Sequence, residues 1–216
     1  MSNIIKEIEK EKLIVIVRGV ESEKLLSLTQ AMCDGGVRFL EITYDQSGKV
    51  SAETTAENIR KLSTAFKGRV HIGAGTVLNE KQVGLTAEAG GEFIISPDIN
   101  ESVVRKTKEY GMVSIPGAFT PTEITTAKRA GADFVKIFPA GAIGAAYIKA
   151  IKSPLSGIKL MAVGGIDDKN AKEYFAAGAC GVGIGANIVD KKLVQKEDWQ
   201  GIKELAERYV KTIKEV

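Results

Sequence analysis

The feature that most constrains this chain is a regular alternation of short, β-branched strand patterns with amphipathic helix patterns. Several of the helical stretches end in glycine, the residue favoured just after a helix C-terminus. Repeated units of this kind build parallel sheets, because each strand needs a crossover helix to return the chain to the same edge. The predicted strands are 13–18, 37–43, 70–76, 93–96, 112–116, 133–139, 159–165 and 180–185.

Eight such units favour a closed (β/α)8 TIM barrel, and a doubly wound open sheet is the alternative. The chain has 216 residues, near the lower limit of roughly 200 for a barrel. No shift in composition and no Ser/Pro-rich linker divides it, so we expect a single domain over residues 1–216. An extra N-terminal helix, over about residues 3–11, is expected to cap the bottom of the barrel.

Composition and charge exclude several classes of function. The net charge is only +3 with mixed signs, so no nucleic-acid partner is expected. No apolar run approaches the roughly 18 residues of a membrane helix, and the charged N-terminus lacks a signal-peptide core, so we expect a cytoplasmic protein without membrane contact. His71 is the single histidine and cannot form a two-histidine zinc centre. We expect no metal and no cofactor, and a structural role for His71 in its strand. Cys33 and Cys180 suit core positions.

Three predicted strands carry a charge on a face that should be buried. Arg18, Glu41 and Lys136 each alternate with apolar residues on one face of their strand, whereas the opposite face is purely aliphatic. The aliphatic faces are expected to pack on the outer helices, so the charged residues should point into the barrel. A lone charge in a dry interior costs several kcal/mol unless it is paired or neutralised.

Two interpretations of these charges remain open at the level of sequence. One is a structural Glu41–Lys136 ion pair, or strand ends that simply reach solvent. The other is an active site at the carboxyl-terminal mouth, where barrel enzymes place their chemistry. Burial lowers the pKa of a lysine, and a neutral amine is a nucleophile. The pattern therefore favours a Schiff-base lysine at position 136 with a carboxylate partner at 41.

Glycines at the ends of the last two strands indicate an anion site. Gly164 and Gly165 end the seventh strand before a helix expected near Asp168, and Gly183 and Gly185 end the eighth. The loops after these strands, together with a helix N-terminus, form the recurrent phosphate site of barrels. The alternative is a set of ordinary turns.

Thr76 ends the third strand after the glycine-rich run 73–75. Its hydroxyl and the neighbouring amides are suited to a substrate carboxylate. Thr76 is equally suited to cap the next helix, and the two roles are compatible.

Seven segments together resemble the 2-keto-3-deoxy-6-phosphogluconate aldolase family, which includes 4-hydroxy-2-oxoglutarate aldolases and the 6-phosphogalactonate counterpart. They follow the family order over almost the whole chain, and the set is far more specific than any one member. The segments are IVRG (16–19), GGVRFLEIT (35–43), GAGTVLN (73–79), ISPDIN (95–100), IPGAFTPTE (115–123), FVKIFPA (134–140) and AVGGI (162–166).

The resemblance implies a (β/α)8 barrel, a homotrimer and a class I lyase that releases pyruvate and an aldehyde from a small 2-keto acid without a cofactor. It maps the Schiff-base lysine onto Lys136 and the acid/base carboxylate onto Glu41. The expected substrate-binding residues are Arg18, Thr76, Pro97, Gly164, Gly165, Gly185 and Ala186. The aldehyde product, glyceraldehyde 3-phosphate or glyoxylate, and the preferred C4 configuration stay open.

Three positions depart from the family pattern. Asp45 stands where some members carry an arginine after the catalytic glutamate, so carboxylate recognition must depend more on Arg18 and Thr76. Val163 and Ala186 replace a threonine and a serine whose hydroxyls contact phosphate. Two rival functions also remain: a phosphosugar isomerase or epimerase, which needs no imine, and a non-catalytic metabolite-binding barrel.

Overall fold

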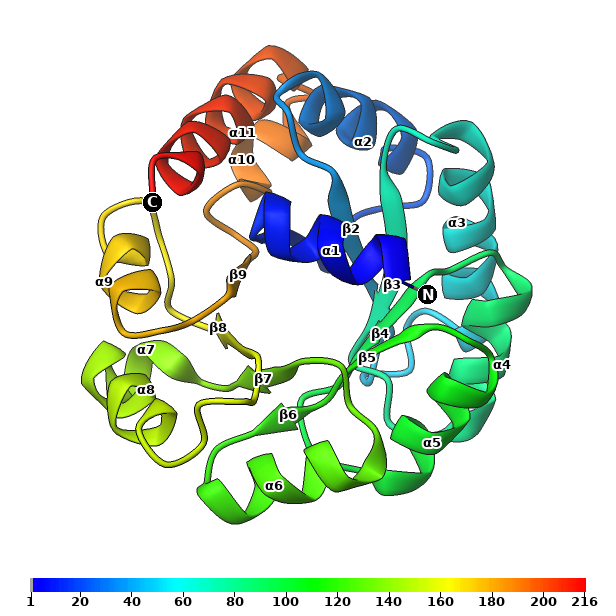
Figure 1. The fold of residues 1–216 in the computed structure, drawn as a ribbon. Helices are drawn as coiled ribbons and strands as arrows, with labels where there is room; N and C mark the ends of the chain where they lie inside the picture. The colour runs from blue at the N-terminus through cyan, green and yellow to red at the C-terminus, as the bar shows by residue number, and fades with distance from the viewer. Residues whose placement is uncertain (1) are drawn as a thin grey trace.

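The computed structural model describes residues 2–216, except the side chains of residues 2 and 3, and it forms a parallel β-barrel surrounded by helices (Figure 1). The strand order is β5-β4-β3-β2-β1-β9-β8-β7-β6. The strands are β1 (Leu13–Val17), β2 (Phe39–Thr43), β3 (His71–Gly75), β4 (Phe93–Ile95), β5 (Val113–Ile115), β6 (Gly117–Ala118), β7 (Val135–Ile137), β8 (Leu160–Val163) and β9 (Gly181–Ile184).

The fifth predicted strand, 112–116, ends at Pro116, which separates β5 from a further short strand, β6, that the sequence did not predict. Segment β5 pairs with β4, and β6 pairs with β7. The Phe134 N–H donates to the Ser114 carbonyl at 3.3 Å, and the Lys136 N–H donates to the Pro116 carbonyl at 2.9 Å. The divided strand therefore joins the two ends of the sheet, although the proline has no N–H of its own to donate. The predicted TIM barrel is confirmed with this one division, and the open-sheet alternative is wrong.

The helices follow the strands in the expected alternation. Within the described residues they are α1 (Ser2–Glu11), α2 (Leu25–Asp34), α3 (Ala52–Ala65), α4 (Glu80–Glu88), α5 (Glu101–Glu109), α6 (Pro121–Ala130), α7 (Ala140–Ile143), α8 (Ala145–Lys152), α9 (Ala171–Ala176), α10 (Lys191–Gln195) and α11 (Trp199–Lys214). Helix α6 shows why local sequence sets these bounds. Thr120 and Glu123 form a capping box, Pro121 occupies the first turn, and Gly131 ends the helix at φ 107°.

Two apolar cores lie on opposite faces of the strands. Val15, Leu40 and Val135 belong to the core between the barrel and the helices. Phe39 and Phe134 belong to a second core inside the barrel, to which α1 contributes Ile8. Helix α1 lies across the amino-terminal opening of the barrel (Figure 1). The predicted alternation and the capping helix are therefore confirmed, and the interior below the charged residues is filled with side chains.

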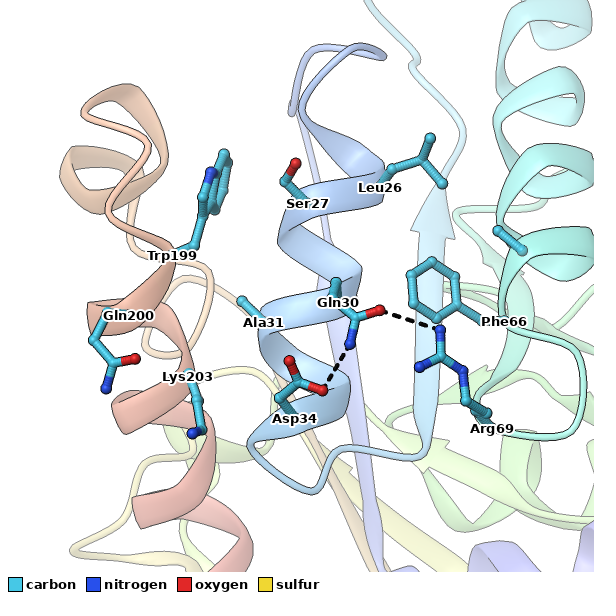
Figure 2. A pocket seen from close by; sticks show the side chains of 11 residues that line it. Leu26, Ser27, Gln30, Ala31, Asp34, Phe66, Arg69, Trp199, Gln200 and Lys203 are labelled. Atoms are coloured by element: carbon cyan, nitrogen blue, oxygen red, sulfur yellow. Dashed lines mark hydrogen bonds between the residues drawn. The ribbon is translucent and has the colours of Figure 1, made fainter.

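A hydrogen bond between Gln30 and Arg69 links α2 to the segment that follows α3 in the outer ring. Gln30 on α2 donates to Asp34 at 2.6 Å and accepts from Arg69, which follows α3, at 3.1 Å (Figure 2). Trp199, at the start of α11, lies on the other side of α2 from Arg69 and lines the same surface pocket. These exposed polar contacts orient helices that are held mainly by the buried core beneath them.

His71 ties the capping helix to the barrel. Its Nε2 lies 2.6 Å from a carboxylate oxygen of Glu7 on α1, and its Nδ1 lies 3.0 Å from Glu92. The ring also stacks on Phe39, with centroids 4.7 Å apart. The His71 side chain is half-buried, whereas its strand was expected to be buried. Its contacts fit the expected structural role. A hydrogen bond and charge attraction from Glu92, with help from Glu7, raise the pKa of His71 despite partial burial.

The stability of the fold is expected to fall as pH rises through the elevated pKa of His71. Because the folded state binds this proton more tightly than the unfolded chain, the contribution is complete below the unfolded pKa of about 6.5 and lost above the folded value. Urea unfolding measured between pH 6 and 9 should show this decline, and it should be absent in His71→Gln. An equal decline in the variant would contradict the assignment.

Candidate active site

A cleft of about 940 Å³ opens at the carboxyl-terminal mouth of the barrel. The chain brings its lining together from the ends of separate strands, since parallel strands all point to this mouth. Every expected site residue except Glu41 lines it, so the cleft contains Arg18, Thr76, Pro97, Lys136, Gly164, Gly165, Gly185 and Ala186. Glu41 lies on β2 inside the barrel, beneath this opening.

Lys136 is buried on β7, with 6% of its surface exposed. Loss of hydration lowers the pKa of its amine, and the Arg18 charge acts in the same direction, whereas Glu41 opposes them. The Nζ lies 4.8 Å from the centre of the Phe138 ring, which flanks the cleft. The amine therefore has the apolar surroundings that make the neutral, nucleophilic form accessible.

Glu41 is buried even more completely, with 1% of its surface exposed. Burial raises the pKa of its carboxyl group, and the nearby charges of Lys136 and Arg18 act against that rise. Its Oε2 has no hydrogen-bond partner within the described residues. An acid with a raised pKa next to an amine with a lowered pKa can exchange protons with a substrate bound between them.

The structural ion pair weighed from the sequence is not formed. Among residues 2–216, no ion pair joins the Lys136 amine to the Glu41 carboxylate within 4.0 Å. Two buried charges that serve only the fold would be expected to meet directly, because contact offsets their lost hydration. The separation instead leaves both groups available to a ligand.

Gly75 makes the position of Glu41 possible. A Cβ at residue 75 would lie 1.6 Å from Oε1 of Glu41. The register explains the encounter: β2 pairs Thr43 with Gly75, so the glutamate side chain passes in front of the end of β3. The glycine in the predicted GAGT segment is therefore a steric requirement of the buried carboxylate.

Thr76 adopts a left-handed backbone, with φ 56°. For a β-branched residue this conformation costs about 1–3 kcal/mol, so surrounding contacts must hold it. Arg18 donates to the Thr76 hydroxyl at 3.0 Å, and Gln46 donates to its carbonyl at 3.3 Å. Arg18 and Thr76 thus form one polar part of the cleft lining.

The opposite end of the cleft is lined by glycine loops. Gly164 and Gly165 have φ of 87° and 78°, and a Cβ on Gly164 would lie 3.1 Å from the Phe138 ring. Within residues 2–216, the N–H groups of Gly165 and Ala186 donate to no protein acceptor. These two amides can therefore donate to an anion in the cleft.

The helix expected near Asp168 begins later, at Ala171. Asp167 accepts from the N–H groups of Lys169 and Asn170, and Asn170 donates to the Gly165 carbonyl at 2.9 Å. This turn stands between the glycine pair and the helix. An anion here must rely on loop amides, because the start of the helix is displaced along the chain.

Asp45 does not line the cleft, although it occupies the position where some relatives have an arginine. Its carboxylate accepts from the N–H groups of Ser47, Lys49 and Val50 and from the Ser47 hydroxyl. These hydrogen bonds lower its pKa to about 2. The residue organises the loop after β2.

Sequence reasoning missed five polar residues that line the cleft, namely Glu21, Lys24, Asn187, Lys191 and Gln195. Asn187 donates to the Ile166 carbonyl at 3.2 Å, which links the loops after β8 and β9. Lys191 begins α10, five residues beyond Ala186 in the chain. The lysine pair that follows the last predicted strand was the available signal for it.

The described residues contain no cluster of three histidine, cysteine or acidic side chains able to hold a metal. Within the same residues, no helix combines the length and the apolarity needed to span a membrane.

Comparison with known families shows which family this chain belongs to. Residues 4–205 match the model of the family described as KDPG and KHG aldolase. The chain belongs to this family. Its barrel is the fold of the family's solved structures.

Two curated members illustrate the similarity. The 2-dehydro-3-deoxy-6-phosphogalactonate aldolase of Escherichia coli is 37% identical over 180 residues, covering 83% of this chain and 85% of the relative. The 2-dehydro-3-deoxy-phosphogluconate aldolase of Haemophilus influenzae is 31% identical over 215 residues, covering 98% and 97%.

Solved structures agree with these relatives. A native KDPGal structure superposes with a TM-score of 0.83 at 35% identity, over 94% of each chain. KDPG aldolase from Legionella pneumophila superposes with a TM-score of 0.84 at 28% identity, over 96% of this chain and 98% of the other. In that second structure pyruvate is captured as a covalent carbinolamine intermediate.

Gly75→Ala is expected to displace the Glu41 carboxylate, because the added methyl group overlaps it. The strain should lower the free energy of unfolding by about 1–3 kcal/mol or more and reduce turnover together with it. Thermal unfolding and steady-state assays measure the two effects. The matched control is Gly157→Ala, whose Cβ meets nothing within 4 Å. Equal behaviour of the two variants would contradict the proposed packing.

Proposed function

We propose that this chain is a class I aldolase that cleaves a phosphorylated 2-keto-3-deoxy sugar acid to pyruvate and an aldehyde through a Schiff base on Lys136. The observation that carries the proposal is the buried amine of Lys136 in the cleft, with the buried carboxyl group of Glu41 beneath the same opening, in a chain that belongs to an aldolase family. Oε2 of Glu41 has no hydrogen-bond partner within the described residues.

The first half of the reaction uses the amine. Neutral Lys136 attacks the C2 ketone of the bound 2-keto acid, and loss of water from the carbinolamine gives an iminium. The capture of pyruvate as a carbinolamine in the Legionella relative supports this step. The iminium is an electron sink, so it stabilises the negative charge that develops at C3 when the C3–C4 bond breaks.

The second half uses the carboxylate. Glu41, directly or through one water, takes the proton from the C4 hydroxyl as the aldehyde leaves. It then returns a proton to C3 of the enamine, and hydrolysis of the resulting imine releases pyruvate and regenerates the amine. Each such proton transfer is worth roughly 10²–10⁴ in rate. The raised pKa of Glu41 suits a group that must alternate between its two protonation states.

The two polar ends of the cleft give the substrate its direction. Arg18 and Thr76 bind the carboxylate of the keto acid, beside Pro97 and the Schiff-base lysine. At the other end the loop of Gly164 and Gly165, with Gly185 and Ala186, donates backbone N–H groups to the phosphate. Lys191 adds positive charge there and compensates for the hydroxyls absent from Val163 and Ala186. Lys24 also lines the cleft, but its amine is paired with Glu21 at 2.9 Å.

Similarity alone leaves the sugar open, and we place the 6-phosphogalactonate type first. The relative with that activity is 37% identical, whereas the phosphogluconate relative from Haemophilus is 31% identical. Steady-state cleavage of both C4 epimers, and of unphosphorylated 4-hydroxy-2-oxoglutarate, decides between them. A homotrimer and a cytoplasmic location, both expected from the sequence, stay predictions. The exposed rings of Phe119 and Phe138 near the mouth are candidate interface residues for the trimer.

Lys136→Ala is expected to abolish cleavage, because no other group supplies the imine. Glu41→Gln should still form the pyruvate imine but turn over at least 100-fold more slowly. Mass spectrometry after treatment with pyruvate and borohydride should show a reduced adduct on the peptide that contains Lys136 in wild type and in Glu41→Gln. A phosphosugar isomerase would gain no adduct, and a binding barrel would release no pyruvate. Near-normal activity of Lys136→Ala would refute the proposal.

Lys191→Ala is expected to raise KM about three- to ten-fold for the phosphorylated substrate, because one charge beside the phosphate is lost. The KM for 4-hydroxy-2-oxoglutarate should stay unchanged, since that substrate has no phosphate. Lys192→Ala is the matched control: it is the next residue of α10 and does not line the cleft. Equal effects of Lys191→Ala on the KM of both substrates would show that Lys191 does not interact with the phosphate.

A further inference from the structure

We infer that Asp45 and Gln46 are positioning residues for recognition of the keto-acid carboxylate, acting through the backbone of Thr76. The inference rests on the proposed function, because it concerns how this chain builds the carboxylate end of that site. It answers a question that the sequence raises. The chain carries Asp45 at the position where the family resemblance implies an arginine in some members.

The first step of the argument is the loop between β2 and α3. Both carboxylate oxygens of Asp45 are occupied: Oδ1 accepts from the Ser47 N–H at 3.0 Å, and Oδ2 accepts from Lys49 and Val50 at 2.8 and 3.0 Å. The Ser47 hydroxyl adds a bond to each oxygen at 2.8 Å. The charge of Asp45 is therefore engaged within its own loop, and the loop is folded around it.

The second step links this loop to the cleft. Gln46 follows Asp45 directly, and its amide nitrogen donates to the Thr76 carbonyl at 3.3 Å. The loop also begins on a fixed base, because the Tyr44 N–H donates to the Gly75 carbonyl at 2.9 Å. Gln46 is exposed, so its position depends on the fold of the loop rather than on burial.

The third step concerns Thr76, which Gln46 and Arg18 hold in place by hydrogen bonds. Thr76 lines the cleft in a left-handed conformation that β-branched residues rarely adopt. Gln46 holds its carbonyl while Arg18 holds its hydroxyl at 3.0 Å. Together they fix the direction of the Thr76 side chain and of the guanidinium that contacts it. Asp45 thus serves the carboxylate site without touching the substrate.

Pyruvate is the probe for this end of the site, because it carries the keto-acid carboxylate and no phosphate. We measure the pyruvate concentration that gives half-maximal formation of the borohydride-reduced adduct in the full-length enzyme. Gln46→Ala and Asp45→Ala are expected to raise it about three- to ten-fold, the effect of losing one hydrogen bond that positions a binding group. Gln46→Glu should raise it further, because a carboxylate cannot donate to the Thr76 carbonyl and repels the ligand.

The measurement includes readouts that a general loss of stability would not move. The aldehyde KM in the condensation direction and the pH profile of adduct formation should match wild type, because the phosphate end and Lys136 are untouched. Asp198→Ala is the matched control: Asp198 caps α11 by accepting from the Gly201 N–H at 2.9 Å and does not line the cleft. It should lower the melting temperature and leave half-saturation by pyruvate unchanged.

The outcomes separate the inference from the proposed function. If wild type forms no reduced adduct, the Schiff-base proposal fails. If wild type forms the adduct and both Gln46 variants saturate at the wild-type pyruvate concentration, the positioning role alone is refuted. Should Asp45→Ala fail to fold, the two Gln46 variants still decide the question, because Gln46 is exposed and makes a single hydrogen bond.

Discussion

The burial of one amine and one carboxylate at the same mouth of the barrel is the constraint on which the rest of the site depends. In water Lys136 would be protonated and Glu41 ionised, and neither would serve the proposed chemistry well. Inside the barrel, loss of hydration lowers the pKa of the amine and raises that of the acid. Because the two groups do not meet in a direct ion pair, a ligand can bind between them and use both.

The scaffold supports this arrangement through features far from the reaction. Below the site the interior is filled by Phe39, Phe93 and Phe134, and α1 closes the opposite end. His71 holds that helix in place, because its ring contacts the carboxylates of Glu7 on α1 and of Glu92 just before β4. A filled interior leaves the mouth as the place where the charged side chains of the strands find space. The absent Cβ of Gly75 provides that space for the glutamate.

The two ends of the cleft have different groups for the anions that we propose they bind. The proposed phosphate end has loop amides and Lys191, whereas the proposed carboxylate end has Arg18 hydrogen-bonded to a threonine with a left-handed backbone. At position 45 this chain departs from the family pattern, and in our proposal Asp45 supports the carboxylate end of the cleft indirectly. An acid here folds the loop after β2, and the loop contributes through the neighbouring Gln46.

The sequence by itself determined the barrel, the capping helix and the inward-facing positions of Glu41 and Lys136. Strand alternation is a local property, so Glu41 and Lys136 could be recognised as charges on an inward face before any strand was placed. The tertiary structure decided what depends on contacts between distant segments. The division at Pro116, the position of Lys191 at the cleft and the hydrogen bonds that hold Thr76 each join segments that are distant in the chain. Such contacts arise only when the barrel closes, because loop conformation follows from the neighbours that closure brings together and not from local periodicity.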